Sequence, residues 1–199
     1  MSRKVQERQV LREVIEEHSR VLEETLATQL ETFERVAELA EECLHEGGKI
    51  LVFGNGGSAA DAQHFAAELV GRFEQDRQAL PALALTVNTS TLTAVANDYG
   101  FDKVFARQVE ALARPGDLAV AISTSGNSGS VVEAAKAARD IGCKVVGMTG
   151  AGGGALAECS DALIAVPSTT VARIQEVHEI CLHALAAWLE KRFFGEGDE

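Results

Sequence analysis

Five short apolar runs, separated by helical segments, constrain the fold of this chain more than any other feature of its sequence. Each run is continuously apolar, which is typical of parallel strands covered on both faces. Regular alternation of strand and helix favours a doubly wound α/β sheet that binds its ligands at the carboxyl ends of the strands. The expected strands span residues 49–53, 82–87, 118–123, 144–149 and 162–166, and the expected helices span 58–73, 89–97, 103–113, 130–141 and 172–194. The sequence therefore predicts a flavodoxin-like, five-stranded parallel sheet preceded by N-terminal helices.

The segment before the first strand, residues 1–46, contains neither proline nor glycine. Its apolar residues recur at steps of three and four, which indicates one amphipathic helix or two. We predict that 1–46 is a helical oligomerisation segment and 47–194 an α/β domain that carries the site, followed by a frayed tail at 195–199. A lid over the sheet is the alternative role of the helices. The apolar positions are Leu22, Leu26, Leu30, Phe33, Ala37, Ala40 and Leu44.

The formal charge of this 199-residue chain is −12, which argues against binding to nucleic acid or to an anionic membrane as its main activity. The four cysteines are scattered without a CxxC pair, as expected of reduced thiols in a cytosolic protein. The first seven residues are too charged for a signal peptide, and no apolar run approaches the ~20 residues of a membrane span. We expect a cytoplasmic protein without a membrane segment.

A glycine-rich turn follows the first strand and opens the next helix. Gly54, Gly56 and Gly57 let the backbone approach an anion, and the helix N-terminus offers free N–H groups. One turn further, His64 and Glu68 stand at i and i+4, so both leave the same helix face. This pair is suited to binding a metal or moving protons.

The same turn also matches the dinucleotide-binding fingerprint as Gly54-x-Gly56-x-x-Ala59. However, the second strand ends at Asn88 without the acid that would hold a ribose, and it begins well beyond the ~30-residue spacing of that unit. The residues therefore favour a small phosphorylated ligand over a nicotinamide cofactor.

A dense run of hydroxyl residues, 123–130, joins the third strand to a helix. Its hydroxyl and N–H groups suit a phosphate, whereas the simpler interpretation is a capped helix start. A helix N-cap needs a single capping residue, so the presence of several hydroxyl groups favours phosphate binding. Asn97 and Asp98 either line the same pocket or end a helix.

The last helix carries three polar residues of interest. Gln175 and His183 are about two turns apart and share a face, but His178 lies at i+3 from Gln175 and is an equal candidate by spacing. The spacing alone leaves the two histidines open.

Four motifs in one order give the chain a family resemblance. The segments 54–64, 96–100, 123–128 and 174–178 together resemble the phosphoheptose isomerases of the sugar isomerase (SIS) superfamily, over nearly the whole chain. The resemblance implies a homotetramer with active sites at subunit contacts and one Zn²⁺ per subunit. It also implies an aldose–ketose isomerase that converts sedoheptulose 7-phosphate to D-glycero-D-manno-heptose 7-phosphate through an enediol, the first step toward nucleotide-activated heptoses.

The resemblance also assigns site residues. The implied metal ligands are His64, Glu68, Gln175 and His183, with Glu68 as the base and His183 as the acid. Asp61 matches a motif carboxylate of less certain role. The implied substrate-binding residues are Asn55, Gly56, Gly57, Glu68, Asn97, Asp98, Ser123, Thr124, Ser125, Ser128 and Gln175.

Two alternatives remain at this stage. One is a non-catalytic SIS protein that binds a replication initiator, a branch that lacks the helix glutamate and the final histidine, here Glu68 and His183. The other is an isomerase for a different sugar phosphate, because the motifs locate a phosphate and an enediol without measuring a seven-carbon chain.

Overall fold

The computed structural model describes residues 3–195, and the side chains from residue 8 onward. The expected tail therefore lies, apart from Gly195, outside the described residues. The strands are β1 (Ile50–Gly54), β2 (Ala82–Ala84), β3 (Leu118–Ile122), β4 (Lys144–Thr149) and β5 (Ala162–Ala165). The helices are α1 (Arg3–His45), α2 (Gly57–Val70), α3 (Thr89–Tyr99), α4 (Ala106–Leu112), α5 (Gly129–Ile141) and α6 (Val171–Phe194), with 3-10 turns η1 (Phe101–Lys103) and η2 (Gly154–Cys159).

The five strands form one parallel sheet in the order β2-β1-β3-β4-β5. This confirms the predicted doubly wound sheet. The chain winds outward in opposite directions from β1 and β3, which are neighbours. A crevice for ligands is expected outside the carboxyl ends of these two strands, at the switch point of the topology.

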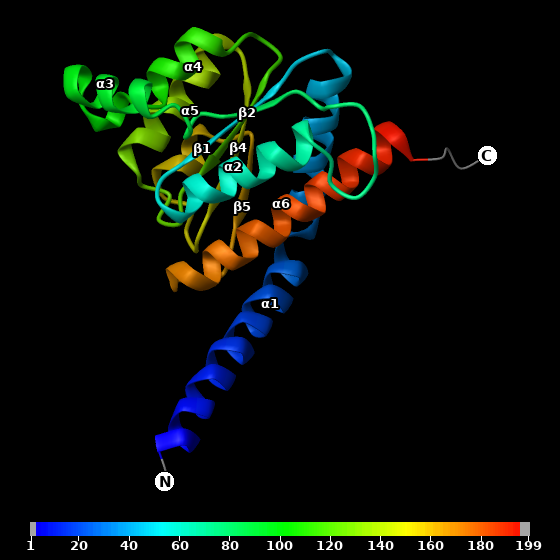
Figure 1. Cartoon of the computed structure of the whole chain (residues 1–199), viewed down its shortest axis with the longest axis vertical. Helices are drawn as coiled ribbons and strands as arrows, with labels where there is room; N and C mark the ends of the chain where they lie inside the picture. The colour runs from blue at the N-terminus through cyan, green and yellow to red at the C-terminus, as the bar shows by residue number, and fades with distance from the viewer. Residues whose placement is uncertain (1–2, 196–199) are drawn as a thin grey trace.

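Helices cover both faces of the sheet, in two separate cores (Figure 1). Successive residues of a strand point to opposite faces, so Ile50 and Val52 pack with α1, α2 and α6, while Leu51 and Phe53 pack with α4 and α5. Because both faces are buried, β1 and β3 carry no exposed residue. This burial on both faces explains why the strands appear as continuous apolar runs in the sequence.

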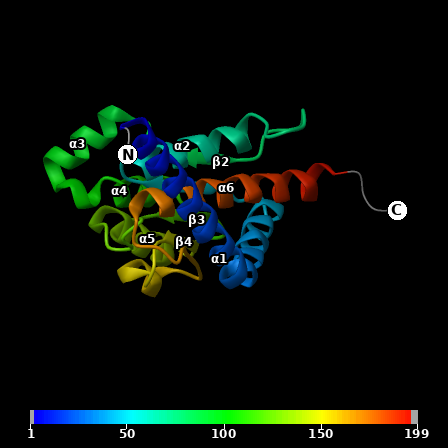
Figure 2. The ribbon, with the colours of Figure 1, turned by 90° about the horizontal axis from the view of Figure 1, so that it is seen from below.

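The segment before the sheet is one helix of 43 residues. Its C-terminal part, from Val36 to Leu44, packs into the core beneath the sheet. The N-terminal part projects from the body of the molecule (Figure 1), so in the view from below it overlies the other elements (Figure 2). The predicted apolar seam is therefore divided, since Leu26 and Leu30 are 63% and 49% exposed. Within the described residues, no helix has the length and apolarity to cross a membrane.

Two elements differ from their expected lengths. Strand β2 stops at Ala84 instead of residue 87 because it lies at the sheet edge and pairs with β1 alone. The helix expected at 103–113 begins at Ala106, since the preceding residues form the tighter turn η1. Neither difference falls on a predicted site residue.

Candidate functional site

The glycine turn and the hydroxyl segment meet at the switch point, because β1 and β3 are adjacent and end on the same edge. Asn55 joins them: its Nδ2 donates to Ser128 Oγ at 2.8 Å and to Ser130 Oγ at 2.9 Å. The residue that follows β1 is thereby fixed to the first turn of α5. The structure brings together two of the predicted substrate-binding segments.

The segment from Ser123 to Ser130, hereafter the serine loop, is held by backbone contacts with the loop that follows β4. Gly126 has φ +66° and packs so closely on Gly153 that a Cβ would overlap the Gly153 carbonyl. The N–H of Gly150 donates to the Thr124 carbonyl at 2.9 Å. Ser125 is exposed, and its Oγ lies 3.5 Å from the Ser123 Oγ. These bonds leave hydroxyl groups at the mouth of the crevice beside the start of α5, where an anion is stabilised.

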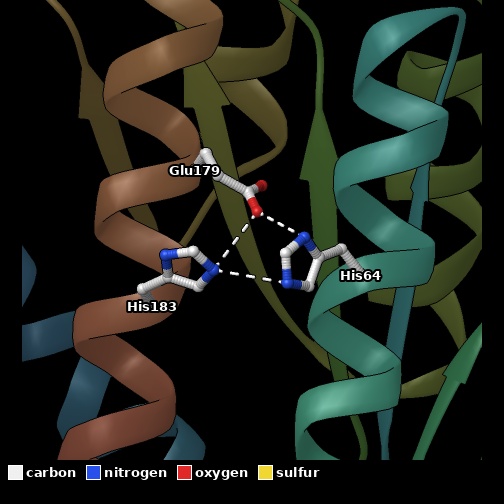
Figure 3. Close-up of side chains that lie close together, drawn as sticks. All are labelled: His64, Glu179 and His183. Atoms are coloured by element: carbon white, nitrogen blue, oxygen red, sulfur yellow. Dashed lines mark hydrogen bonds and ion pairs between the residues drawn. The ribbon is translucent and has the colours of Figure 1, made fainter. Parts of the chain in front are cut away.

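A second polar group lies between α2 and α6, which pack side by side (Figure 1). His64 Nε2 is 3.0 Å from Glu68 Oε1 and 3.4 Å from His183 Nε2. Glu179 Oε1 lies 2.7 Å from His64 Nδ1 and 3.3 Å from His183 Nε2 (Figure 3). We call these four residues the histidine cluster. Their side chains are 22–47% exposed, so a ligand can reach them.

Glu68 is positioned by a buried ion pair beneath it. Arg77 donates to the backbone carbonyl of Glu68 at 2.8 Å and, through Nε, to Glu190 at 3.0 Å. Both members of the pair are almost fully buried. Although burial acts against it, the pKa of Glu190 is lowered, because three backbone N–H groups of residues 73–75 and Arg77 donate to its carboxylate. The loop after α2 is thus fixed to α6.

Gln175 lies one turn before the cluster on α6. Its Nε2 donates to Asp61 Oδ1 at 3.4 Å, and its carboxamide occupies the space above Gly57, where a Cβ would overlap it. Burial raises the pKa of Asp61 to about 6, although the bond from Gln175 lowers it; the charge of Glu179 raises it further. Gln175 therefore contacts the glycine turn and α2, and among the described contacts none joins it to His64 or Glu68.

The structure separates the two histidines that spacing left open. His178 is fully buried, and its Nε2–H donates to the Thr149 carbonyl at 3.1 Å. Burial lowers the pKa of His178 to about 4, so it is neutral near pH 7. His183, one and a half turns later, faces His64 across the gap between the helices. His178 is a core residue, and His183 is the histidine available to a ligand.

The remaining predicted residues, Asn97 and Asp98, lie at the end of α3. Both are exposed, and Asn97 Nδ2 donates to Asp98 Oδ1 at 2.8 Å. The chain then passes through η1, where the Asp102 carboxylate packs on Gly129, the first residue of α5. The end of α3 is therefore tied to the serine loop side of the crevice, and not to the histidine cluster.

Glu179 is the site residue that the sequence predictions missed. It precedes His183 by four residues, the same spacing that singled out His64 and Glu68. That signal was available on α6, but nothing in the sequence indicates that the α6 pair faces the α2 pair. Only the packing of the two helices brings them together.

The donor set of the cluster fits a zinc ion. Zinc takes imidazole nitrogen and carboxylate oxygen at about 2.0–2.2 Å, which places two ligands of a tetrahedron about 3.3 Å apart. The His64 and His183 Nε2 atoms are 3.4 Å apart, and Glu68 Oε1 lies 3.0 Å from the His64 Nε2. Of the described residues, His64, Glu179 and His183 form the one His/Cys/Asp/Glu group compact enough to hold a metal ion.

Comparison with known proteins agrees with this geometry. The family model described as "SIS domain" matches residues 14–150. The parallel sheet and the two polar segments at its carboxyl edge thus define a SIS domain. Relatives named phosphoheptose isomerase include those of Aliarcobacter butzleri, 53% identical over 84% of this chain and 89% of the relative, and of Geotalea daltonii, 51% identical over 92% and 95%.

A solved structure supports the same grouping. The phosphoheptose isomerase of Neisseria gonorrhoeae superposes with a TM-score of 0.87 at 47% identity, covering 94% of this chain and 99% of that one. The chain belongs to the phosphoheptose isomerase family.

Proposed function

We propose that the protein interconverts sedoheptulose 7-phosphate and D-glycero-D-manno-heptose 7-phosphate. The observation that carries this proposal is that a SIS domain carries both a histidine–glutamate cluster between α2 and α6 and a hydroxyl-rich loop at the carboxyl edge of its sheet. The product would feed the assembly of nucleotide-activated heptoses, and we propose that the protein acts in the cytoplasm.

Ketose–aldose isomerisation moves one proton between C1 and C2 through an enediol. It requires a base at carbon and an acid at the neighbouring oxygen. We assign the base to Glu68 and the acid to His183. Glu68 suits its role because Arg77 fixes its backbone while its carboxylate faces the cluster. His183 suits its role because its ring is partly exposed at the opposite wall.

The phosphate of the substrate is assigned to the serine loop, at Ser123, Thr124, Ser125 and Ser128, with Asn55 bridging to the glycine turn. This places the charged end of the sugar away from the reacting carbons. Binding energy from such a remote group orients the reacting atoms and is expressed in kcat as well as in KM. Asn97, Asp98 and Gln175 would contact the sugar chain between the two ends.

We further propose that each subunit holds one Zn²⁺ with His64, Glu68 and His183, and with Gln175 as the ligand implied by the resemblance. Because a residue that coordinates zinc is a poor free base or acid, the roles of Glu68 and His183 require that the metal shift during turnover or be partly structural. When bound, the ion supplies Lewis-acid polarisation of the substrate carbonyl. Gln175 reaches the ion only if its side chain leaves Asp61, because its carboxamide bonds to that residue in the described structure.

The test of function is an assay of the purified protein against a panel of ketose phosphates of five to seven carbons, with and without a chelator. We expect turnover of sedoheptulose 7-phosphate, followed by appearance of the aldose phosphate. Turnover of a shorter ketose phosphate alone would assign a different substrate. A chain with no isomerase activity that captures a purified replication initiator would instead favour the binding-protein alternative.

We also propose a homotetramer, assembled through the projecting part of α1. A groove lined mainly by apolar residues, with Thr25 and Gln29 among them, lies between α1 and α6. Leu26, Leu30 and Ile180 are exposed along it, and such a face is typical of a helical interface.

Sedimentation should therefore give a tetramer for the wild-type chain. A Leu26→Glu, Leu30→Glu variant should give smaller species, while Leu83→Glu, on the edge strand, should leave the tetramer intact. A monomeric wild-type chain would contradict the proposal.

A further inference from the structure

Glu179 is the member of the histidine cluster for which neither the sequence nor the family resemblance supplies a role. Its two oxygens have different surroundings. Oε1 contacts both rings, at 2.7 Å from His64 Nδ1 and 3.3 Å from His183 Nε2, whereas Oε2 is buried without a hydrogen-bond partner among the described residues. The carboxylate is thus directed at the rings of His64 and His183 and not at a charged residue on the surface.

The two nitrogens of the His64 ring face different partners (Figure 3). Nδ1 faces Glu179, while Nε2 faces Glu68 and His183. A metal ion shared with Glu68 and His183 therefore takes the lone pair of Nε2. The neutral ring then carries its one proton on Nδ1. Glu179, an acceptor, is placed to receive that N–H.

We propose that Glu179 is a positioning residue of the metal site: its carboxylate accepts the Nδ1–H of His64 and so holds Nε2 toward the ion. This inference rests on the proposed zinc site. A carboxylate behind a ligating histidine fixes the tautomer and the ring orientation and raises the basicity of the ligating nitrogen. Glu179 can do so from α6 while His64 belongs to α2, so the contact also couples the two helices that build the site.

The ring nitrogen that Glu179 faces distinguishes this role from direct ligation. Glu179 Oε1 forms an ion-pair contact of 2.7 Å with His64 Nδ1, on the side of the ring opposite Nε2. The 3.4 Å between the His64 and His183 Nε2 atoms matches the about 3.3 Å between two ligands of tetrahedral zinc. Glu179 Oε1 also lies 3.3 Å from His183 Nε2, a spacing that direct ligation would share, so the loss of zinc affinity relative to His64→Ala decides between the two roles.

The experiment compares zinc affinity in the full-length wild-type protein and three variants, by competition with a chromophoric chelator. Glu179→Leu should weaken zinc binding roughly 10- to 100-fold, the usual cost of losing such a partner. Glu179→Gln should fall between this variant and the wild type, because its carboxamide oxygen still accepts the N–H. Glu176→Gln is the matched control: it removes the same charge one turn earlier, from a residue that contacts His18 and Arg173, and it should retain wild-type affinity.

A second readout is the protonation pattern of the His64 ring, from long-range proton–nitrogen NMR spectra of the zinc-loaded protein. We expect Nδ1 protonated in the wild type and a broadened or mixed pattern in Glu179→Leu, with both proteins folded by circular dichroism. Equal zinc affinity in Glu179→Leu and wild type would overturn the positioning role while leaving the zinc site in place.

Two further outcomes also overturn it. A loss as large as that of His64→Ala would make Glu179 a direct ligand. A wild-type chain that isomerises sedoheptulose 7-phosphate but binds no zinc would remove the positioning role and leave the isomerase assignment standing.

Discussion

The histidine cluster and the serine loop are built in different ways. The serine loop lies within eight consecutive residues after β3 and is fixed by backbone bonds and by the close packing of Gly126 on Gly153. The cluster joins side chains from two helices, and His64 and His183 are 119 positions apart in the chain. The anchoring half of the site therefore depends on the backbone of two adjacent loops, whereas the reactive half depends on how two helices pack.

The largest effect should come from the reactive half. In Glu68→Gln the carboxamide cannot take a proton, so kcat should fall roughly 1,000-fold, within the range for loss of a general base. KM should change little, because the serine loop is untouched. Steady-state kinetics measures both, and Glu74→Gln, an exposed acid on the following loop, is the control. Near-normal turnover in Glu68→Gln would show that Glu68 is not the base.

The pH dependence of stability should reveal how His178 supports the two halves of the site. It bonds to the Thr149 carbonyl, and the N–H of the next residue, Gly150, donates to the serine loop. Burial lowers its folded-state pKa from 6.5 to about 4, so the unfolded chain binds more protons between these values. Stability should therefore be complete above about pH 6.5 and fall as the pH drops toward 4, by roughly 3 kcal/mol.

Denaturant unfolding of chelator-treated protein between pH 4 and 7.5 measures this loss. The free energy of unfolding should fall less steeply with decreasing pH in His178→Gln, because glutamine at position 178 does not titrate. Identical slopes in the two proteins would mean that other groups govern the acid sensitivity.

An intermediate effect should come from the anchoring half. Thr124→Ala removes one hydroxyl donor to the substrate phosphate, and KM should rise roughly 10- to 100-fold, since a hydrogen bond to a charged group contributes about 1.5–3 kcal/mol. Adding Ser125→Ala should raise KM further. Titration with inorganic phosphate should show a parallel weakening. Ser160→Ala, beyond the amino end of β5, should match the wild type. Unchanged affinity in the double variant would place the phosphate elsewhere.

The smallest effect should come from the contact between the halves. A methyl group in Gly57→Ala would displace the Gln175 carboxamide, which can move because it ends a flexible side chain. We expect kcat/KM to fall about tenfold or less, with the bond to Asp61 lost. A double-mutant cycle checks the cause: in a Gln175→Ala background the same glycine substitution should have no further effect. Additive losses would show that Gly57 acts on its own.

Much of the fold was predictable because its signals are local. Five continuous apolar runs predicted five strands, all of which are present in that order, and the glycines and hydroxyls after 53 and 122 predicted the loops at their ends. The errors lie where tertiary context decides. β2 is short because an edge strand has one partner, and α4 is short because η1 precedes it. The long helix α1 was predictable, but not the point at which it leaves the core.

The site was predictable in part. The His64–Glu68 pair could be read from helical spacing, but spacing could not choose between His178 and His183, because burial against Thr149 distinguishes them. Glu179 was not predicted, although it stands at i, i+4 with His183. Such a pair forms part of a site only if the helix faces another polar pair, and the sequence does not show which helix α6 faces. Zinc binding and the assignment of Gln175 as a ligand remain predictions.

The span between His64 and His183 also sets when the site can exist during synthesis. Domains are made N-terminus first, at about 5–20 residues per second, so α2 emerges roughly 6–24 s before its partner histidine is translated. β1 and the serine loop can form their mutual contacts in that interval, whereas the cluster cannot. A chain that ended before residue 183 would contain the serine loop but lack His183, together with the α6 residues Leu185 and Leu189 that pack in the core beneath the sheet.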